Sequence, residues 1–255
     1  MEDIALHAGS DLSNGKTFSL NEETLATVFQ PIISLGGRAR EIFGYEALTR
    51  GPAGSPIEDP TNLFLRAHEQ GKLCEVDIMC LRNTLKNSRP FPAGTKIFIN
   101  IHPLSLGKST RSFSDILHLI ENLGMDSHQF ILELVEQFPV HNIDMFLGNI
   151  AMLRREGVLI GLDDIGAGYA DFFILSKIKP DFLKVGGYFS DHIKMNSIKQ
   201  KVVRAVVELS QEFNAMVIAE GIERKEDLHT LESLGVHLGQ GFYFARPAPF
   251  DKLQL

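Results

Sequence analysis

The chain reads Val158-Leu159-Ile160-Gly161-Leu162-Asp163-Asp164, an apolar run followed directly by two adjacent acids. An apolar run of this kind predicts a buried strand of a parallel sheet, which has no room for carboxylates in its middle. Two carboxylates at the strand exit repel each other unless a cation lies between them. Gly166-Ala167-Gly168 follows and allows a tight turn. The stretch suggests a divalent metal site at the mouth of a sheet, with an Asp N-cap of the next helix as the alternative.

Strand-like and helix-like segments alternate on both sides of this stretch. Strands are expected at residues 27–33, 42–48, 96–100, 129–134, 158–162, 181–185, 215–219 and 236–240. Helices are expected at 60–70, 75–86, 113–123, 143–155, a short segment ending at Lys177, 190–213 and 224–234. The link at residues 36–40 is too short for a crossover helix, so the first two strands should be antiparallel. The series predicts an α/β fold, a modified (β/α)8 TIM-type barrel with an antiparallel first strand.

Length and composition are compatible with one barrel domain. The chain has 255 residues, a size that α/β barrels reach undivided, and its 44% hydrophobic content supports a proper core. Residues 1–20 are polar and uneven and are expected to form a tail or an added helix. No linker-like segment interrupts the rest, so residues 21–255 are predicted to form a single domain.

Charge and cysteine usage exclude several classes of protein. The net charge of −7 disfavours a surface for DNA or RNA, which requires basic stripes. We expect no membrane span, because no apolar stretch is long enough, and no signal peptide, because residues 1–7 lack its basic patch and apolar stretch. Cys74 and Cys80 make no disulfide framework. A cytoplasmic location is therefore expected.

Polar side chains recur near the ends of the predicted strands. They are Glu46, with Arg50 just beyond, Asn100, Glu133, Asp163, Asp164, Lys184, Glu220 and Gln240. In a barrel the C-terminal strand ends converge on one rim, where active sites are built. Amide or carboxylate oxygens are the ligands that Mg²⁺ and Mn²⁺ prefer, and they are offered here by Glu46, Asn100, Glu133, Asp163, Asp164 and Glu220. The pattern predicts a metal site on this rim.

The number of acids favours two ions over one. Two metal ions bridged by one Asp suit an in-line phosphoryl displacement, in which they activate water and hold the scissile phosphate. Each position has a structural alternative: a strand-end acid can cap a helix, Asn100 can bond a loop amide, and Lys184 can be a buried ion-pair partner. Their recurrence at successive strand ends favours a catalytic, or once-catalytic, metal site.

Several motifs follow one another in a fixed order. They are Phe29-Gln30-Pro31-Ile32, Glu46-Ala47-Leu48-Thr49-Arg50, Asn100, Glu133-Leu134-Val135-Glu136, Asp163-Asp164-Ile165-Gly166-Ala167-Gly168-Tyr169, Lys184, Ala219-Glu220-Gly221-Ile222-Glu223 and Gln240-Gly241-Phe242-Tyr243-Phe244-Ala245-Arg246-Pro247. Together they resemble the EAL domains, a family that acts on cyclic di-GMP in bacterial signalling. The resemblance covers residues from about Thr27 to Pro249.

The resemblance implies a phosphodiesterase that opens cyclic di-GMP to linear pGpG with Mg²⁺ or Mn²⁺. One ion would be held by Glu46, Asn100, Glu133 and Asp163, and the other by Asp163, Asp164 and Glu220. Lys184, with Glu220 and Gln240, would serve catalysis, and Lys184 would orient the attacking water. Gln30, Leu48 and Arg50 would contact the substrate. Glu136 resembles the acid that anchors the glycine-rich loop near the dimer contact of these enzymes, which implies a homodimer.

One departure from the family pattern concerns the chemistry. The family usually carries an acid two residues after the lysine, where this chain has Gly186. Loss of a group that orients water slows turnover and leaves binding intact. The alternative function is therefore a weak or inactive EAL domain that acts as a cyclic di-GMP receptor or a protein-interaction module. Restoring the acid with Gly186→Asp should raise the rate if that acid matters.

Milder departures lie in the loop after the two acids, at Ile165, Ala167, Ala170 and Asp171. They bear on regulation through that loop, and regulation by a partner protein is possible. Hydrolysis of another phosphodiester on the same rim also stays open, because a fold alone does not set the substrate.

Overall fold

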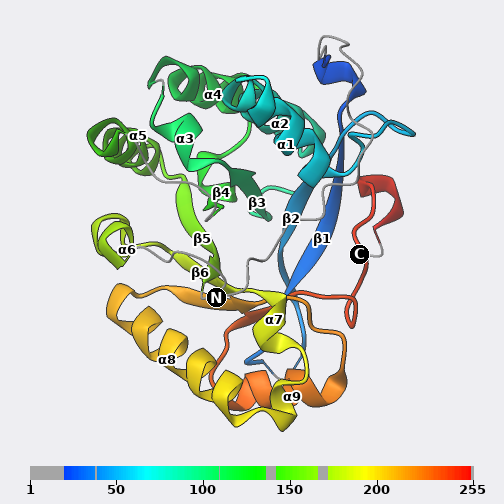
Figure 1. The fold of residues 1–255 in the computed structure, drawn as a ribbon, viewed down its shortest axis with the longest axis vertical. Coiled ribbons are helices and arrows are strands. Elements are labelled where there is room, and N and C mark those ends of the chain that lie inside the picture. The colour runs from blue at the N-terminus through cyan, green and yellow to red at the C-terminus, as the bar shows by residue number, and fades with distance from the viewer. Residues whose placement is uncertain (1–19, 38, 109, 136–141, 166–171, 254–255) are drawn as a thin grey trace.

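A computed structural model describes residues 20–37, 39–108, 110–135, 142–165 and 172–253. Eight strands close into a barrel in sequence order (Figure 1). They are β1 (Ala26–Ser34), β2 (Ile42–Arg50), β3 (Lys96–Ile101), β4 (Phe130–Leu134), β5 (Leu159–Ile165), β6 (Phe182–Val185), β7 (Met216–Ala219) and β8 (Leu238–Gly239). The α/β barrel predicted from the sequence is confirmed.

The first strand runs against its two neighbours. β1 pairs antiparallel with β2 and with β8, whereas every later neighbouring pair is parallel. The expected antiparallel start is therefore confirmed. Because β1 runs in reverse, its residues meet the rim of the barrel in the opposite order to those of the other strands.

Helices cover the outside of the barrel. They are α1 (Pro60–Glu69), α2 (Leu73–Asn87), α3 (Pro103–Leu106), α4 (Thr110–Asn122), α5 (Ile143–Arg155), α6 (Phe172–Ile178), α7 (Gly187–Ser190), α8 (Ser197–Phe213) and α9 (Lys225–Ser233). Short 3₁₀ turns are η1 (Glu22–Thr24), η2 (Ser127–Gln129), η3 (Ile193–Met195) and η4 (Phe250–Lys252). In Figure 1, α1, α2, α4 and α5 lie on one side of the barrel and α8 and α9 on the other.

The single helix expected over residues 190–213 was wrong. The chain forms α7, η3 and then α8, with His192 in the left-handed region at φ 54°. Asn196 starts α8, because its side chain accepts hydrogen bonds from the backbone N–H groups of Ile198 and Lys199. Asn is a favoured N-cap residue, so Asn196 was a local signal of this helix start that the prediction of one continuous helix missed.

The barrel interior is filled by an apolar layer below the C-terminal rim. Its fully buried members are Ile32, Phe98, Ile131, Phe182, Ile218 and Leu238. Side chains two positions apart on a strand share a face, so a polar residue lies two positions after each of these on the parallel strands and two positions before Ile32 on the reversed β1. Asn100 thus follows Phe98, and Glu133 follows Ile131. These polar residues form the rim, which is the next layer of side chains after the apolar one.

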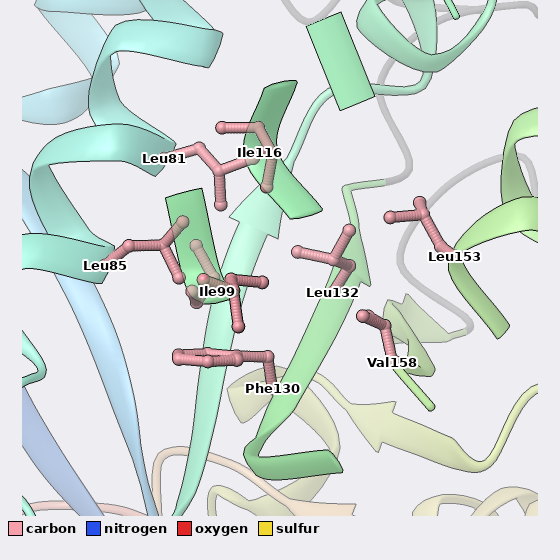
Figure 2. A pocket seen from close by; sticks show the side chains of 9 residues that line it. Leu81, Leu85, Ile99, Ile116, Phe130, Leu132, Leu153 and Val158 are labelled. Atoms are coloured by element: carbon pink, nitrogen blue, oxygen red, sulfur yellow. The ribbon is translucent and has the colours of Figure 1, made fainter. Parts of the chain in front are cut away.

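Outward-facing strand residues pack against the helices. The larger outer cluster includes Phe130, Ile99 and Leu132 of the barrel wall together with side chains of α2, α4 and α5. A small cavity lies within this layer (Figure 2). Its lining is wholly apolar, from Leu81, Leu85, Ile99, Ile116, Ile120, Phe130, Leu132, Leu153 and Val158. An apolar cavity between helices and barrel wall is a gap in packing without the polar groups that orient a ligand.

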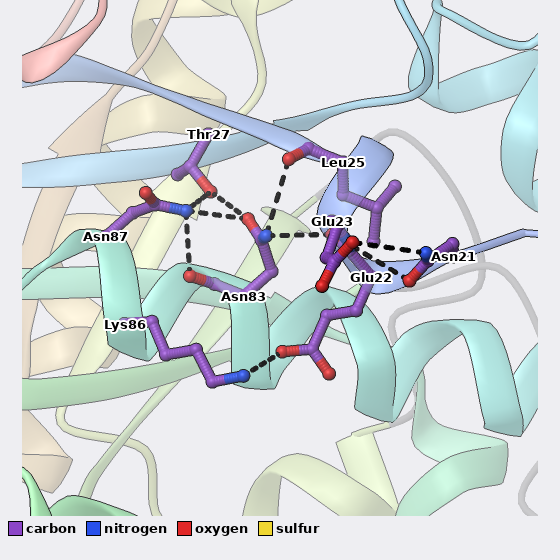
Figure 3. A network of polar contacts seen from close by, with 8 residues as sticks. All are labelled: Asn21, Glu22, Glu23, Leu25, Thr27, Asn83, Lys86 and Asn87. Atoms are coloured by element: carbon purple, nitrogen blue, oxygen red, sulfur yellow. Dashed lines mark hydrogen bonds and ion pairs between the residues drawn. The ribbon is translucent and has the colours of Figure 1, made fainter.

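A polar network joins η1 and the start of β1 to α2 (Figure 3). Asn83 accepts a hydrogen bond from the Thr27 hydroxyl at 2.9 Å and donates to the backbone carbonyl of Leu25 at 3.3 Å. Glu22 forms an ion pair with Lys86. Most of the expected tail, residues 1–19, lies outside the described residues.

Two further expectations concern the chain as a whole. Among the helices that the structure describes, none has the length and apolar character that crossing a membrane requires. Cys74 and Cys80 both lie in α2 as free thiols; Cys80 is buried and Cys74 is partly exposed.

Candidate metal centre

The strand-end residues singled out in the sequence meet in one place. Glu46 comes from β2, Asn100 from β3, Glu133 from β4, Asp163 and Asp164 from β5 and Lys184 from β6, while Glu220 and Gln240 directly follow β7 and β8. Glu46, Glu133, Lys184 and Gln240 are buried. The barrel register therefore gathers side chains that are far apart in the sequence.

Lys184 lies at the centre of this cluster. Its Nζ is 2.7 Å from Glu220, 3.2 Å from Glu133, 3.3 Å from Glu46 and 3.5 Å from Asp163. The lysine side chain is 0% exposed. One ammonium group thus faces four carboxylates, an excess of negative charge that a divalent cation can balance.

The proton affinities in the cluster follow from burial and mutual charge. Burial by itself lowers the pKa of Lys184, but the surrounding carboxylates raise it well above its ordinary value, so the ammonium stays charged. Burial raises the pKa of Glu133 well above its usual range, although Lys184 opposes the shift. Burial also raises the pKa of Glu220 to about 8. In both acids, burial therefore disfavours the charged form.

The sequence suggested that the two adjacent acids follow the strand. In the structure both acids lie inside it. β5 continues to Ile165, and its pairing with β6 is irregular between Leu162 and Ile165. Asp164 adopts a left-handed backbone conformation, φ 53°, and its N–H donates to Asp163 Oδ1 at 2.9 Å. In a regular strand neighbouring side chains point to opposite faces. The irregularity re-aims Asp164 to the side of Asp163.

Three acids reach one another closely enough to share an ion. Oxygens of Asp163, Asp164 and Glu220 all lie within 4.8 Å of one another. Burial is the main cause that raises the pKa of Asp164, and the charge of Asp163 adds to it. These are the residues that the family resemblance assigns to the second ion.

Two buried oxygens without a hydrogen-bond partner show whether the residues assigned to the first ion suit a metal. Asn100 Oδ1 and Glu133 Oε1 are buried and accept no hydrogen bond in the described structure. Asn100 uses its other side-chain atom, Nδ2, to donate to Glu46 at 2.9 Å, so its oxygen is left for another ligand. Buried acceptor oxygens without donors are costly unless a cation satisfies them. The donor set fits a hard divalent cation.

Gln240, which follows β8, and Gln30 of the reversed first strand support the cluster. Gln240 Nε2 donates to Glu46 at 2.7 Å and to Gln30 Oε1 at 2.9 Å. Gln30 in turn donates to the carbonyl of Ala245 at 2.9 Å. The sequence indicated substrate or water contacts for both glutamines, and it missed their role in holding Glu46. A pairing of β1 with β2 that sets Gln30 opposite Glu46 was the structural signal.

The remaining predicted residues lie at the margin of the cluster or beyond it. Leu48 and Arg50 follow Glu46 at two-residue spacing on β2, so they continue its face toward the end of the strand. Both are partly exposed, and Arg50 donates to the Thr49 carbonyl at 2.8 Å. Glu136 and most of the glycine-rich loop lie outside the described residues.

Gly186 faces Asp164 across the ends of β5 and β6. A Cβ atom placed on Gly186 would lie 2.5 Å from Asp164 Oδ1. The Gly186→Asp change that the sequence suggested as a simple restoration therefore has a structural consequence: any side chain at this position displaces the Asp164 carboxylate.

Comparison with known proteins agrees with this geometry. The family model described as EAL domain matches residues 15–247. The probable cyclic di-GMP phosphodiesterase PdeN of Escherichia coli (strain K12) is 28% identical over 239 residues, which are 91% of this chain and 45% of the relative. The blue light- and temperature-regulated antirepressor BluF of the same organism is 25% identical over 86% of this chain and 53% of its own length.

The solved structure of Klebsiella pneumoniae BlrP1 with calcium and cyclic di-GMP is also similar. It shares 26% sequence identity and a TM-score of 0.79, over 91% of this chain and 58% of that one. A manganese and cyclic di-GMP complex of BlrP1 matches equally well, with a TM-score of 0.79 over 90% of this chain. The chain spans 30% to 45% of the length of the curated relatives y4lL and PdeN.

Proposed function

We propose that this chain, which belongs to the EAL domain family, is a divalent-metal-dependent phosphodiesterase that hydrolyses cyclic di-GMP to linear pGpG. The observation that carries the proposal is the ring of carboxylates around Lys184, with buried oxygens of Asn100 and Glu133 left without donors. An apolar ligand pocket needs no such charge, whereas phosphate hydrolysis does. The cyclic di-GMP complexes of BlrP1 support the choice of substrate.

Two ions are proposed, held by the residues that the geometry brings together. Glu46, Asn100, Glu133 and Asp163 would hold the first, and Asp163, Asp164 and Glu220 the second, so Asp163 would bridge them. Such ions lower the pKa of water and offset negative charge on the scissile phosphate. Mg²⁺ or Mn²⁺ is the proposed metal, because all the donors are oxygens.

The other side chains would orient the reacting groups. Lys184 is already charged and within reach of the four carboxylates, so its ammonium can hold the attacking water beside the scissile phosphorus. Arg50 would offer its guanidinium to a phosphate, beside Leu48. Gln240 and Gln30 would keep Glu46 in place and so fix the geometry of the first ion site. The glycine-rich loop with its anchor Glu136, a homodimer and a cytoplasmic location stay predictions.

A second function is favoured by one observation, the absence of an acid at Gly186. A chain that binds cyclic di-GMP without useful turnover would act as a receptor or an interaction module. The similarity to the antirepressor BluF is compatible with that reading. The two functions share the binding site and differ only in the chemical step.

One assay separates the two functions. The protein is incubated with cyclic di-GMP and Mg²⁺ or Mn²⁺, and pGpG is followed by chromatography. Asp163→Asn should lower turnover at least about 100-fold, because it removes the charge of the proposed bridging ligand. Lys86→Met, a change in the exposed pair with Glu22, is the matched control and should keep wild-type turnover. Tight binding of cyclic di-GMP without product would reject the enzyme and support the receptor.

A further inference from the structure

The backbone at Gly186 does not require glycine. Its φ is −58° and its ψ is 153°, a conformation open to any residue. Glycine is needed for conformational reasons only where φ is positive, so another cause must explain a glycine here. The space that a side chain would fill supplies that cause.

The space beside Gly186 is taken by the carboxylate of Asp164. An ideal Cβ on Gly186 would lie 2.5 Å from Asp164 Oδ1, 3.6 Å from its Cγ and 4.0 Å from its Cα. Real Cβ contacts do not come this close, so one group would have to move. Asp164 Oδ1 is the end of a side chain, so it can rotate away without unfolding the barrel.

The backbone of Asp164 has little freedom to follow. Its left-handed conformation is fixed on one side by the N–H bond to Asp163 and on the other by the pairing of Ile165 with Val185. A side chain at Gly186 would therefore change only where the Asp164 carboxylate points. That direction decides whether Asp163, Asp164 and Glu220 stay within 4.8 Å of one another.

The next residue offers a natural contrast. A Cβ placed on Gly187 would meet its nearest neighbour, Gly221 Cα, at 3.5 Å, an ordinary van der Waals contact. Gly187 is the first residue of α7, where alanine is well tolerated. The two adjacent glycines thus differ in whether a methyl group would reach the acidic cluster.

We propose that Gly186 is a positioning residue for Asp164: the missing side chain leaves the place in which the Asp164 carboxylate joins Asp163 and Glu220 around one divalent ion. The inference rests on the proposed metal-dependent function. It changes the meaning of the departure at this position, because Gly186 acts through the space it leaves and not only through the acid it lacks.

The test measures metal binding without substrate. Free Mn²⁺ is followed by electron paramagnetic resonance during titration of the full chain, as wild type, Gly186→Ala, Gly187→Ala, Asp164→Ala and the double variant Gly186→Ala with Asp164→Ala. Gly186→Ala should weaken one of the Mn²⁺ sites about tenfold, the usual effect of disturbing a ligand's support. Gly187→Ala should bind as wild type. The melting temperature in EDTA should be the same for both alanine variants.

The double variant decides the mechanism. If Gly186 acts through Asp164, Gly186→Ala should have no further effect once Asp164 is already alanine. Equal Mn²⁺ affinities of Gly186→Ala and Gly187→Ala would overturn the proposal, as would a full additional loss in the double variant. Tighter Mn²⁺ binding by Gly186→Asp with an unchanged Gly186→Ala would also overturn it and restore the missing acid as the explanation.

The outcome is separable from that of the phosphodiesterase assay. A wild-type chain without turnover that still shows the Mn²⁺ difference rejects the enzymatic function and keeps the positioning role. Turnover by the wild type with no Mn²⁺ difference among the variants supports the enzymatic function and rejects the positioning role.

Discussion

Two buried carboxylates, Asp77 on an outer helix and Glu133 on a barrel strand, differ in what surrounds them. Asp77 of α2 is 2% exposed and accepts the backbone N–H of His102 at 3.0 Å. Glu133 of β4 is 0% exposed; one oxygen accepts from Lys184 and the other has no partner. Burial raises the pKa of both acids. Only one of them lies among other charges.

The difference separates a structural acid from a functional one. Asp77 ties α2 to the start of α3 through a neutral backbone donor. Glu133 is surrounded by Glu46, Asp163 and Glu220 in addition to Lys184, an arrangement that is repulsive without a further cation. Burial of an acid alone therefore does not indicate a functional site. Several acids that share one cation, with buried oxygens that lack hydrogen-bond partners, do indicate one.

The largest expected effect comes from removing the lysine of the functional cluster. Lys184→Met leaves buried carboxylates without their cation and should lower the free energy of unfolding by about 3–5 kcal/mol in EDTA. Mn²⁺ should restore more stability to this variant than it adds to the wild type, because the ion replaces the missing charge. Urea unfolding with EDTA and with Mn²⁺ measures both quantities. An equal gain in stability from Mn²⁺ in the two proteins would contradict the idea that the Lys184 ammonium balances the carboxylates when no metal ion is bound.

The next effect sets the two acids directly against each other. Glu133→Gln keeps the shape of the side chain but removes its charge, and should weaken Mn²⁺ binding about 10- to 100-fold. Asp77→Asn makes the same chemical change at the other acid and should leave Mn²⁺ affinity unchanged. Isothermal titration with Mn²⁺ measures both variants. A similar loss in both would show that the comparison fails and that Asp77 also supports the metal site.

The last prediction concerns the titration of Asp77, whose effect on the free energy of unfolding is small for each pH unit. Burial raises its pKa to about 7, whereas an Asp in an unfolded chain titrates near about 3.9. Between these values the folded state holds a proton that the unfolded state lacks, so this group's contribution to stability falls as pH rises from about 4 to 7, and is level above that. The slope is at most roughly 1.4 kcal/mol per pH unit.

Asp77→Asn isolates this contribution from that of the metal-site acids. Its amide does not titrate, so the stability of the wild type relative to this variant should decline over the same pH range. Urea unfolding in EDTA at pH 4, 5, 6, 7 and 8 gives the difference. Parallel curves for the two proteins would show that Asp77 stays ionised in the folded state.

The sequence predicted the class of fold and the members of the cluster, because both depend on local patterns. Alternating strand and helix segments indicated the barrel, and the short link at residues 36–40 indicated its antiparallel start. A polar residue two positions after an apolar interior one marks the rim on strand after strand, as Asn100 after Phe98 shows. The assignment of Asp163 and Asp164 to an ion rested on another local pattern, two adjacent acids directly after an apolar run.

Tertiary structure decided how these residues face one another. The irregular pairing of β5 with β6 turns Asp164 to the side of Asp163, and the end of β6 brings Gly186 against Asp164. Neither contact can be read from neighbouring residues, because each depends on the register between strands. A pattern of residue types fixes which side chains face inward; closure of the barrel fixes which of them touch.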